Sequence, residues 1–447
     1  MYNGTMDTIK KLYFINTYGC QMNIHESEKI AGVLEKLGYS PCDSEQKADV
    51  LVYNTCCIRE TAEFKIHGHI GEAKILKQQN PNLIVVVCGC MSQQSGVAQN
   101  LKRRFPFVDV ILGTSNLDLL EQAIVNAQNE KSTVNVEEKN NVLVNLPKVR
   151  TSRPNAWVNI IYGCNNFCTY CIVPYVRGRE HSRPQQDVLN EVKELVSLGY
   201  KEITLLGQNV NSYGNDLKDG TNFSTLLNEV AKIEGDFRIR YLTNHPKDLT
   251  DDVIEAIANN AKICNSIHLP VQSGSSAILK AMNRKYDRDD YLKLVSKLRK
   301  AIPDIGISTD IMVGFPGETD QDFLDTLDLV QKARFSSAFC FIYSRRKGTV
   351  ADKMEQIPRS VKGERIKRLL EVQNVITKEI SKEMEGTLQR VLVEGKNKKY
   401  VNTYCGRTEN GRLVNIKSDV DLFDQFVWVK IKNYQSATLW GEIVKED

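Results

Sequence analysis

The sequence predicts an α/β protein of several domains: an N-terminal parallel α/β domain, an open barrel of six strand–helix repeats, and a small C-terminal β-barrel. Apolar, β-branched runs of strand length alternate with helix-like stretches over residues 1–130 and again over residues 154–385. Short alternating strands replace that pattern over residues 386–447. The length of 447 residues agrees with three domains of roughly 150 residues each.

The N-terminal domain is predicted from four apolar runs, at residues 12–17, 50–54, 83–87 and 108–113. Helix-like stretches follow these runs, and this order favours a parallel sheet. Cys20, Cys56 and Cys90 each lie just past the end of one of the first three runs. Because the carboxyl ends of parallel strands share one edge, where ligand sites form, the three cysteines can converge into a three-thiolate site.

The neighbouring cysteines leave the ligand choice at this edge open. A single cysteine at a strand end is more often a small buried residue than a ligand, but three at equivalent places favour ligation. Cys57 is expected to point away from Cys56, because adjacent strand residues face opposite ways. Cys88 lies two residues before Cys90 and can share its face.

A polar, charged stretch at residues 131–153 predicts a linker before the second domain. Six runs then predict its strands, at residues 158–162, 202–206, 238–242, 266–271, 306–313 and 338–343. Amphipathic stretches lie between them. Six units fall short of the eight of a closed TIM barrel, so we expect an open (βα)6 partial TIM barrel with a wide mouth, suited to a bulky substrate.

The loop after the first of these strands carries the most specific motif, CxxxCxxC, formed by Cys164, Cys168 and Cys171. Three thiolates at this spacing can hold three irons of a 4Fe-4S cube and leave the fourth iron open for a ligand. A zinc knuckle or a disulfide is the alternative. Zinc sites usually have a fourth protein ligand, for which His181 is the nearby candidate.

Composition indicates a protein that is not secreted and does not span a membrane. The N-terminus has no long apolar segment, and no apolar run reaches membrane-spanning length. In a cytoplasmic protein, the twelve cysteines are better explained as metal ligands or buried thiols than as a disulfide framework. The formal net charge of +4 is small, so a polyanionic partner must be bound by local patches.

Polar residues gather at the carboxyl ends of the barrel strands, where the chemistry of α/β barrels is found. They include Gln208, Asn209, His245, Gln272, Ser273 and Asp310. Helix caps and turns are the ordinary explanation for such residues. Gln272 and Asp310 are the exceptions, because each lies in or just beyond an apolar strand, where an unpartnered polar side chain is costly.

The C-terminal domain is predicted from short alternating strands at residues 388–394, 413–417, 427–431 and 439–444. Gly and Asn turns separate them, a pattern typical of a small OB-like β-barrel. A basic stretch at residues 359–382 precedes them and predicts a long helix. A solvated helix face is the ordinary explanation for its charge, so it is weak support for RNA binding.

Several strings together resemble the methylthiotransferase branch of radical S-adenosylmethionine (SAM) enzymes over essentially the whole chain. The strings are TYGCQMN from Thr17, NTC from Asn54, CGC from Cys88, GCNNFCTYCIVPYVRGRE from Gly163, LLGQNVNSY from Leu205 and HLPVQSGS from His268. Within this branch, GCQMN and GQNVNSY are similar to the MiaB type, which acts on N6-dimethylallyladenosine in tRNA. The C-terminal barrel is similar to a TRAM domain.

The resemblance implies two 4Fe-4S clusters. Cys164, Cys168 and Cys171 would bind the radical SAM cluster, and Cys20, Cys56 and Cys90 would bind an auxiliary cluster that supplies sulfur. By analogy with other radical SAM barrels, Gln272, Arg284 and Asp310 would contact SAM, and Tyr170 would pack near its adenine. The guanidinium fork of Arg284 suits a carboxylate, although an exposed helix-end cation is the ordinary alternative. No side chain is assigned as catalytic.

The implied reaction is methylthiolation of carbon 2 of N6-dimethylallyladenosine at position 37 of tRNA. One SAM molecule would provide a radical, because this C–H bond is unactivated, and a second would donate the methyl group. The implied partners are a tRNA and a low-potential electron donor such as a flavodoxin, with the enzyme a cytoplasmic monomer. The rivals are a non-catalytic RNA-binding protein and an enzyme that methylthiolates a protein aspartate or threonylcarbamoyl-adenosine.

This sequence departs from the family pattern in two places. Cys57 and Cys88 stand where smaller residues are expected, and the SRRKGT string after Tyr343 is unusually basic. Arg345 and Arg346 in that string are candidates for phosphate contacts.

Overall fold

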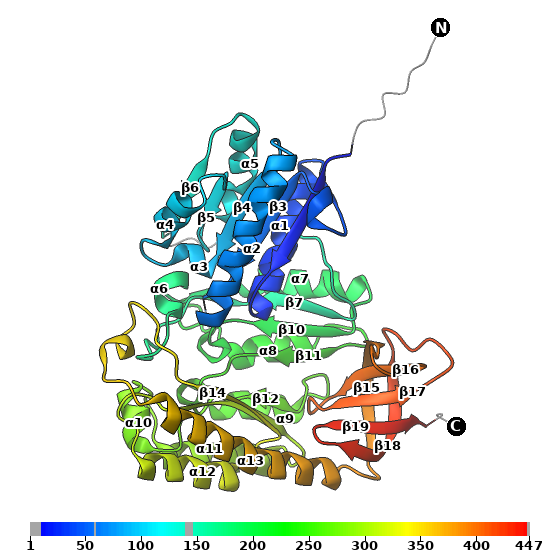
Figure 1. The fold of residues 1–447 in the computed structure, drawn as a ribbon. Helices are drawn as coiled ribbons and strands as arrows, with labels where there is room; N and C mark the ends of the chain where they lie inside the picture. The colour runs from blue at the N-terminus through cyan, green and yellow to red at the C-terminus, as the bar shows by residue number, and fades with distance from the viewer. Residues whose placement is uncertain (1–9, 58–59, 139–145, 445–447) are drawn as a thin grey trace. The chain divides into compact units, whose positions relative to one another are not determined.

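The computed structural model describes residues 10–57, 60–138 and 146–444, without the side chains of residues 60–64 (Figure 1). The chain forms two compact units. The first runs to Thr151 and also includes Ile172–Arg179, and the second is formed by Ser152–Cys171 and the chain from Glu180 onward. The short segment after the CxxxCxxC loop therefore belongs to the first unit, which the sequence did not predict.

The first unit is built on a six-stranded parallel sheet with strand order β2-β1-β3-β4-β5-β6. Its strands are β1 (Leu12–Thr17), β2 (Ser40–Pro41), β3 (Val50–Thr55), β4 (Ile84–Gly89), β5 (Val110–Leu112) and β6 (Thr133–Asn135). The four predicted runs are confirmed as β1, β3, β4 and β5. The edge strands β2 and β6 are additional.

Strand β6 lies inside residues 131–153, which the sequence assigns to a linker. It pairs with β5, and its polar residues Thr133 and Asn135 give no apolar signal. A three-residue edge strand of this kind is held by backbone hydrogen bonds rather than by burial. The division of the chain at residues 130 and 153 stays a prediction, but the first part of the assigned linker belongs to the sheet.

Helices cover both faces of this sheet. One face packs against α1 (Gln21–Lys36) and α5 (Leu120–Gln128). The other packs against α2 (Glu60–Gln79), α3 (Cys90–Gln93), α4 (Val97–Arg104) and α6 (Val173–Arg177). Strand β3 shows the alternation, since Val50 and Val52 join the first core and Leu51 and Tyr53 the second.

The second unit contains the predicted partial barrel as two three-stranded parallel sheets. The first is formed by β7 (Asn155–Asn159), β10 (Glu202–Leu206) and β11 (Arg238–Tyr241), and the second by β12 (Ser266–His268), β13 (Gly306–Val313) and β14 (Ser337–Ile342). An isolated bridge pairs Ile239 of β11 with Ile263, three residues before β12. The open six-stranded barrel is confirmed, and a hairpin of β8 (Ile161–Tyr162) and β9 (His181–Ser182) extends the first strand.

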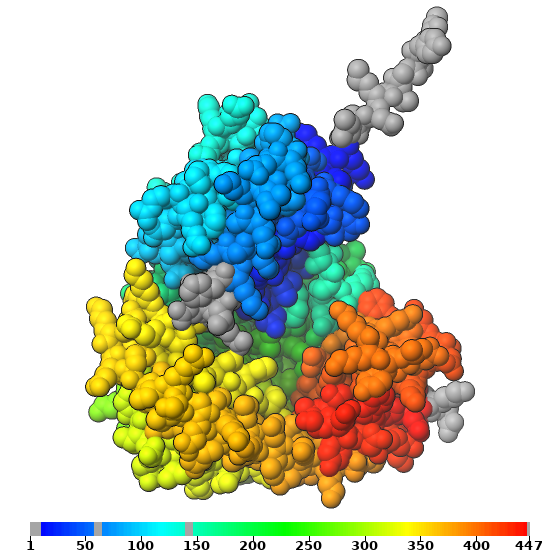
Figure 2. Space-filling model, in the orientation of Figure 1, coloured from blue at the N-terminus to red at the C-terminus, as the bar shows by residue number. Residues whose placement is uncertain are grey.

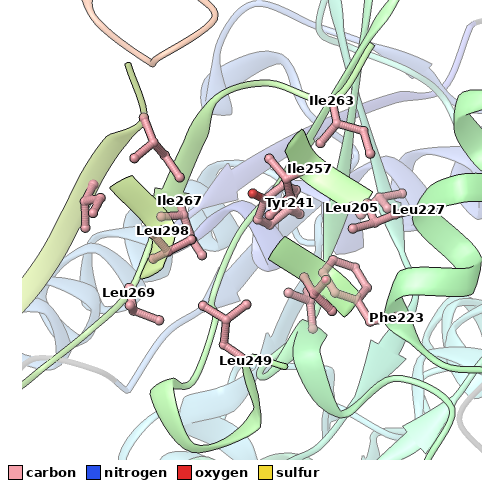
Figure 3. Packing of buried hydrophobic residues seen from close by; sticks show 14 of the residues in the cluster. Leu205, Phe223, Leu227, Tyr241, Leu249, Ile257, Ile263, Ile267, Leu269 and Leu298 are labelled. Atoms are coloured by element: carbon pink, nitrogen blue, oxygen red, sulfur yellow. The ribbon is translucent and has the colours of Figure 1, made fainter. Parts of the chain in front are cut away.

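Seven helices in the described part of the chain surround these strands. They are α7 (Gln185–Ser197), α8 (Phe223–Ala231), α9 (Asp251–Asn259), α10 (Ser276–Ala281), α11 (Arg288–Ala301), α12 (Asp320–Ala333) and α13 (Arg359–Glu383). Figure 3 shows part of the core, where Leu205, Tyr241 and Ile267 of the strands pack with Phe223 and Leu298 of the helices. Each of these side chains is almost completely buried, and burial of this kind contributes about 1.5–3 kcal/mol per aliphatic side chain.

The C-terminal segment forms a closed five-stranded barrel, as predicted, drawn in orange and red in Figures 1 and 2. Its strands are β15 (Leu388–Lys396), β16 (Thr403–Thr408), β17 (Leu413–Lys417), β18 (Phe426–Gln435) and β19 (Thr438–Ile443). Strand β16 was not predicted, because its sequence, TYCGRT, is mostly polar. The six-residue strand nevertheless pairs on both sides, which closes the barrel.

A buried charge network attaches this small barrel to the rest of the second unit. Glu202 accepts hydrogen bonds from Arg238 and Arg240, each at 2.6 Å. The same guanidinium groups donate to the backbone carbonyls of Arg407 and Thr408 in the small barrel, at 2.8 and 2.6 Å. These contacts lie at the amino ends of β10 and β11, away from the carboxyl ends where the CxxxCxxC loop begins.

Candidate cluster sites

The CxxxCxxC loop follows β8 and is shaped by its own backbone. Gly163 and Phe167 both have positive φ, at 73° and 46°, which turns the chain sharply around Cys164 and Cys168. Cys171 N donates to Cys168 O at 2.9 Å, so the last two cysteines sit on one tight turn. The described contacts therefore hold the three thiols on a compact loop, as a cluster site requires.

Side chains from the loops of the same unit fix this segment. Asn283 Nδ2 donates to the carbonyl of Phe167 at 3.0 Å, and Thr169 Oγ1 donates to the carbonyl of Ala281 at 3.0 Å. Lys247 Nζ donates to Asn166 Oδ1 at 2.8 Å. These hydrogen bonds hold the loop in place.

Arg284 lies beside one of the three cysteines. It is buried, and its Nη1 donates to Cys168 Sγ at 3.4 Å and to the Tyr170 hydroxyl at 3.5 Å. Its Nη2 donates to Pro270 O at 2.8 Å, and its Nε donates to the Tyr286 hydroxyl at 2.8 Å. The alternative of an exposed helix-end cation is therefore wrong. A SAM carboxylate at Arg284 would have to compete with these protein partners.

Tyr170, Gln272 and Asp310, the other predicted SAM contacts, lie in the same unit as Arg284. Tyr170 is partly buried against a cluster of apolar residues, and burial raises the pKa of its hydroxyl well above the ordinary value. Gln272 has a positive φ of 72°, which is unusual for a residue with a side chain. Its backbone N–H donates to Asp310 O, and its carbonyl accepts from Met312 N, both in β13. Asp310 Oδ2 lies 3.6 Å from His268 Nε2. Their contacts to SAM stay a prediction.

In the first unit, the register of the sheet aligns the three predicted cysteines. Thr17 pairs with Asn54, and Asn54 pairs with Cys88. Cys20, Cys56 and Cys90 lie three, two and two residues beyond these paired positions. The neighbouring strands β1, β3 and β4 thus deliver one cysteine each to the same edge, as the sequence predicts.

Two glycines with positive φ bring the loops of this edge together. At Gly19, with φ 115°, an added Cβ would lie 2.9 Å from Cys56 Sγ and 2.6 Å from its Cβ. At Gly89, with φ 97°, it would lie 2.4 Å from Thr55 O. The loops before Cys20 and Cys90 therefore approach the end of β3 more closely than any side chain would permit.

The two extra cysteines occupy different environments. Cys88 packs in the core beside α1 and α5, on the opposite side of the sheet from Cys90, and burial raises the pKa of its thiol. Cys57 packs in the same core as Cys90 and hydrogen-bonds to it. The expectation that Cys88 can share the face of Cys90 is therefore wrong, because β4 ends at Gly89 and the chain turns into α3 before Cys90.

The Cys90 thiol is the more acidic of the two candidates for the third ligand. Its pKa falls to about 7, because Cys57 hydrogen-bonds to it and the positive charge of Arg177 lies nearby, which together outweigh burial. A thiol that ionises readily is the better iron ligand. Arg177 lies within one of the family strings, but nothing in the sequence assigned it a role. The signal available in the sequence was an arginine that follows the apolar string IVPYV and precedes Gly178.

The donor set fits 4Fe-4S clusters better than single metal ions. In the described residues, no group of three or more His, Cys, Asp or Glu side chains is arranged to hold one metal ion. A tetrahedral zinc site with His181 would require such a group. A cube has a separate iron for each thiolate, so its ligands need not meet at one point. Three thiols on one loop, and three on one sheet edge, suit that arrangement.

Arg345 and Arg346 form the basic pair that departs from the family pattern. Arg345 forms an ion pair with Asp352 at 3.0 Å on the surface. Surface pairs of this kind contribute little to stability. A role in phosphate contact stays a prediction.

Three family models cover most of the chain. Residues 158–330 match the radical SAM superfamily, residues 12–113 match an uncharacterized protein family, UPF0004, and residues 382–444 match the TRAM domain. A relative from Clostridium botulinum is 53% identical over 433 residues, which are 96% of each chain. A Clostridium tetani relative is 51% identical over 99% of this chain and 100% of its own. Both are named tRNA-2-methylthio-N(6)-dimethylallyladenosine synthase.

The chain belongs to this synthase family. The resemblance inferred from the sequence is confirmed, and so is the cofactor class of the family, two 4Fe-4S clusters and SAM. No helix in the described part of the chain is both long and apolar enough to cross a membrane.

Solved structures show the same fold in more distant radical SAM proteins. The methyltransferase TsrM from Kitasatospora setae, with cobalamin and a [4Fe-4S] cluster bound, matches 85% of this synthase-family chain and 80% of its own, with a TM-score of 0.57. OxsB, a cobalamin-dependent radical SAM enzyme, matches 83% and 56% with a TM-score of 0.52. Each is 13% identical to the chain, so the likeness concerns the fold alone.

Proposed function

We propose that this enzyme attaches a methylthio group to carbon 2 of N6-dimethylallyladenosine at position 37 of tRNA. Relatives with this name are more than 50% identical over nearly the whole chain. The observation that carries the proposal is the pair of separate cysteine sets, one at the sheet edge of the first unit and one on the loop after β8 in the second. A reaction that needs both a radical and a sulfur donor requires two such sites. A non-catalytic RNA-binding protein requires neither.

Each cysteine set has its own task in this proposal. Cys164, Cys168 and Cys171 hold the cluster that binds SAM, and Cys20, Cys56 and Cys90 hold the cluster that carries sulfur. When bound, the clusters and two SAM molecules supply the electron, the radical, the sulfur and the methyl group. The protein supplies position and shields the reaction from water.

The residues around the CxxxCxxC loop have positioning tasks. Arg284 holds the Cys168 sulfur by an N–H···S contact and orients Tyr170, which supports a place for the SAM adenine beside this ring. The strained backbone of Gln272 fixes its side chain at the end of the strand segment next to β13. Asp310, which lies 3.6 Å from His268 Nε2, is our candidate for contact with a SAM hydroxyl or amine.

The small C-terminal barrel is our candidate for the contact with the tRNA stem. Trp428 is more than a third exposed, in a groove next to Phe426, and Arg390 stacks over the Phe426 ring at 3.8 Å. Exposed aromatic rings beside arginine are typical of stacking surfaces for nucleic-acid bases. The loop before β16 adds the exposed residues Lys398 and Lys399, which suit phosphates.

We further propose that a low-potential donor such as a flavodoxin reduces the enzyme, and that it works as a monomer in the cytoplasm, where its tRNA substrate is found.

Mass spectrometry of modified nucleosides tests this function. A strain that lacks the gene should accumulate N6-dimethylallyladenosine without its methylthio group, and the gene should restore the modification. The purified enzyme should modify a dimethylallylated tRNA and leave the unmodified tRNA unchanged. Loss of methylthio-threonylcarbamoyl-adenosine, or of methylthio-aspartate in a protein, would instead select one of the two rival substrates.

A further inference from the structure

The buried side chain of Arg177 forms a charged contact in the interior of the first unit. It donates from Nη1 to Glu26 Oε1 at 2.7 Å and from Nη2 to Glu26 Oε2 at 3.3 Å. Nη2 also donates to Asn23 Oδ1 at 3.1 Å. None of the three residues is more than 8% exposed. Asn23 and Glu26 stand three residues apart on α1, the helix that begins directly after Cys20.

The same guanidinium lies beside the proposed auxiliary cluster ligands. Val176, its neighbour on α6, packs in the same core as Cys90, and α1, which carries Asn23 and Glu26, begins directly after Cys20. The positive charge of Arg177 acts on both thiols. The carboxylate of Glu26 holds the guanidinium in place through both of its oxygens. A buried Arg–Glu pair by itself contributes little net stability, because desolvation offsets the attraction. The place of the pair beside two of the proposed ligand cysteines indicates a function beyond packing.

Helix α6 is built to deliver this side chain. Ile172 and Val176 pack into the core that contains Cys57, Cys90 and Met91. Thr114 Oγ1 donates to Val176 O at 2.5 Å, which fixes the end of the helix. Gly178 follows with φ 74°, so the chain turns away immediately after Arg177. The position of the guanidinium is therefore set by the fold of the first unit.

We propose that Arg177 is a positioning residue that sets the reduction potential of the auxiliary cluster. Its positive charge favours the more negative, reduced state of a thiolate-bound cluster, and the negative charge of Glu26 moderates that effect while Glu26 orients the guanidinium. The inference rests on the proposed ligation by Cys20, Cys56 and Cys90. Arg177 follows the CxxxCxxC loop in the sequence, but its proposed role is at Cys20, Cys56 and Cys90.

The test uses the full-length chain in which Cys164, Cys168 and Cys171 are replaced by alanine, so that only the auxiliary cluster remains. Arg177→Gln, Arg177→Lys and Glu26→Gln are added singly. Iron is counted after anaerobic reconstitution, and the midpoint potential is measured by titration followed by electron paramagnetic resonance. Glu28→Gln is the matched control, because Glu28 is equally buried on α1 but pairs with Arg150 instead.

The expected shifts have opposite signs. Arg177→Gln should lower the midpoint potential, because it removes a cation and leaves the Glu26 charge. Glu26→Gln should raise it, because it removes an anion and leaves the Arg177 charge. Arg177→Lys should lie between the parent and Arg177→Gln, and Glu28→Gln should match the parent. A merely structural role would give iron loss in both variants and no shift of opposite sign.

The outcomes separate this inference from the proposed function. If the parent chain binds no iron, the ligation by the first-unit cysteines is wrong. If the parent binds about four irons and the two variants shift together or not at all, the role of Arg177 is wrong. If Arg177→Gln fails to hold iron, Glu26→Gln decides: a raised potential supports the inference and an unchanged or lowered one overturns it.

Discussion

Replacement of Gly19 by alanine should disable the auxiliary site and spare the radical SAM site. The backbone at Gly19 has φ 115°, a conformation that costs a residue with a side chain about 1–2 kcal/mol. The new methyl group would also lie 2.9 Å from Cys56 Sγ and 2.6 Å from its Cβ, and Cys56 is itself only 3% exposed. Overpacking of this kind costs a further 1–3 kcal/mol, roughly. We therefore expect a loss of about 2–5 kcal/mol in the free energy of unfolding of the first unit.

Gly38→Ala supplies the matched control for this prediction. Gly38 lies in the same unit with φ 86°, but an added Cβ would meet nothing within 4 Å. Its substitution should therefore cost only the conformational strain, about 1–2 kcal/mol. The difference between the two variants isolates the collision with Cys56.

Two measurements check it. Urea unfolding of the apoprotein gives the stability difference, and iron analysis after anaerobic reconstitution gives the cluster content. Gly38→Ala should retain about eight irons, and Gly19→Ala should retain about four, with SAM cleavage to 5′-deoxyadenosine still present. Equal stabilities and equal iron contents in the two variants would show that Cys56 does not need this close approach, and would remove Cys56 from the site.

The remaining predictions separate the sites by chemistry. Alanine at all three cysteines of the CxxxCxxC loop should reduce iron from about eight to about four and abolish SAM cleavage; full iron content would show that the loop binds no cluster. Cys90→Ala should abolish methylthiolation and retain SAM cleavage, whereas Cys88→Ala should retain both, and the reverse pattern would make Cys88 the ligand. In filter binding, Trp428→Ala should weaken tRNA affinity by about 1–3 kcal/mol at every salt concentration. Lys398→Ala with Lys399→Ala should instead reduce the salt dependence, by a slope of about one for each phosphate that is no longer neutralised; unchanged binding in both would place RNA docking elsewhere.

The sequence predicted the strands that carry a strong apolar signal and missed the polar ones. Runs such as VLVYNT and IVVVCG are buried on both faces, so their composition alone identifies them. Strands β6 and β16 are short and polar, and they exist because a neighbouring strand supplies hydrogen bonds. Their presence depends on the sheet rather than on their own residues, which local patterns do not report.

The same holds for the candidate sites: residues close together in the sequence were predicted, and a residue brought in from a distant segment was missed. Spacing was sufficient to select Cys164, Cys168 and Cys171, because all three lie on one loop. The alignment of Cys20 with the other strand-end cysteines followed from the rule for parallel sheets. Arg177 was missed because it comes from a five-residue helix more than eighty residues after Cys90 in the chain. Analogy with other radical SAM barrels predicted that Arg284 contacts SAM. It did not predict the hydrogen bond from Arg284 to Cys168, which the structure shows.

The placement of α6 also determines how the chain can be dissected. A fragment that ends at Thr151 contains Cys20, Cys56 and Cys90 but lacks Ile172 and Val176, which complete the core around Cys90. It also lacks Arg177, so the carboxylate of Glu26 would stay buried without its cation, a situation that costs several kcal/mol. The first unit is therefore not an independent N-terminal domain in sequence. Experiments on the auxiliary cluster need the full chain, with the CxxxCxxC loop silenced by substitution rather than removed.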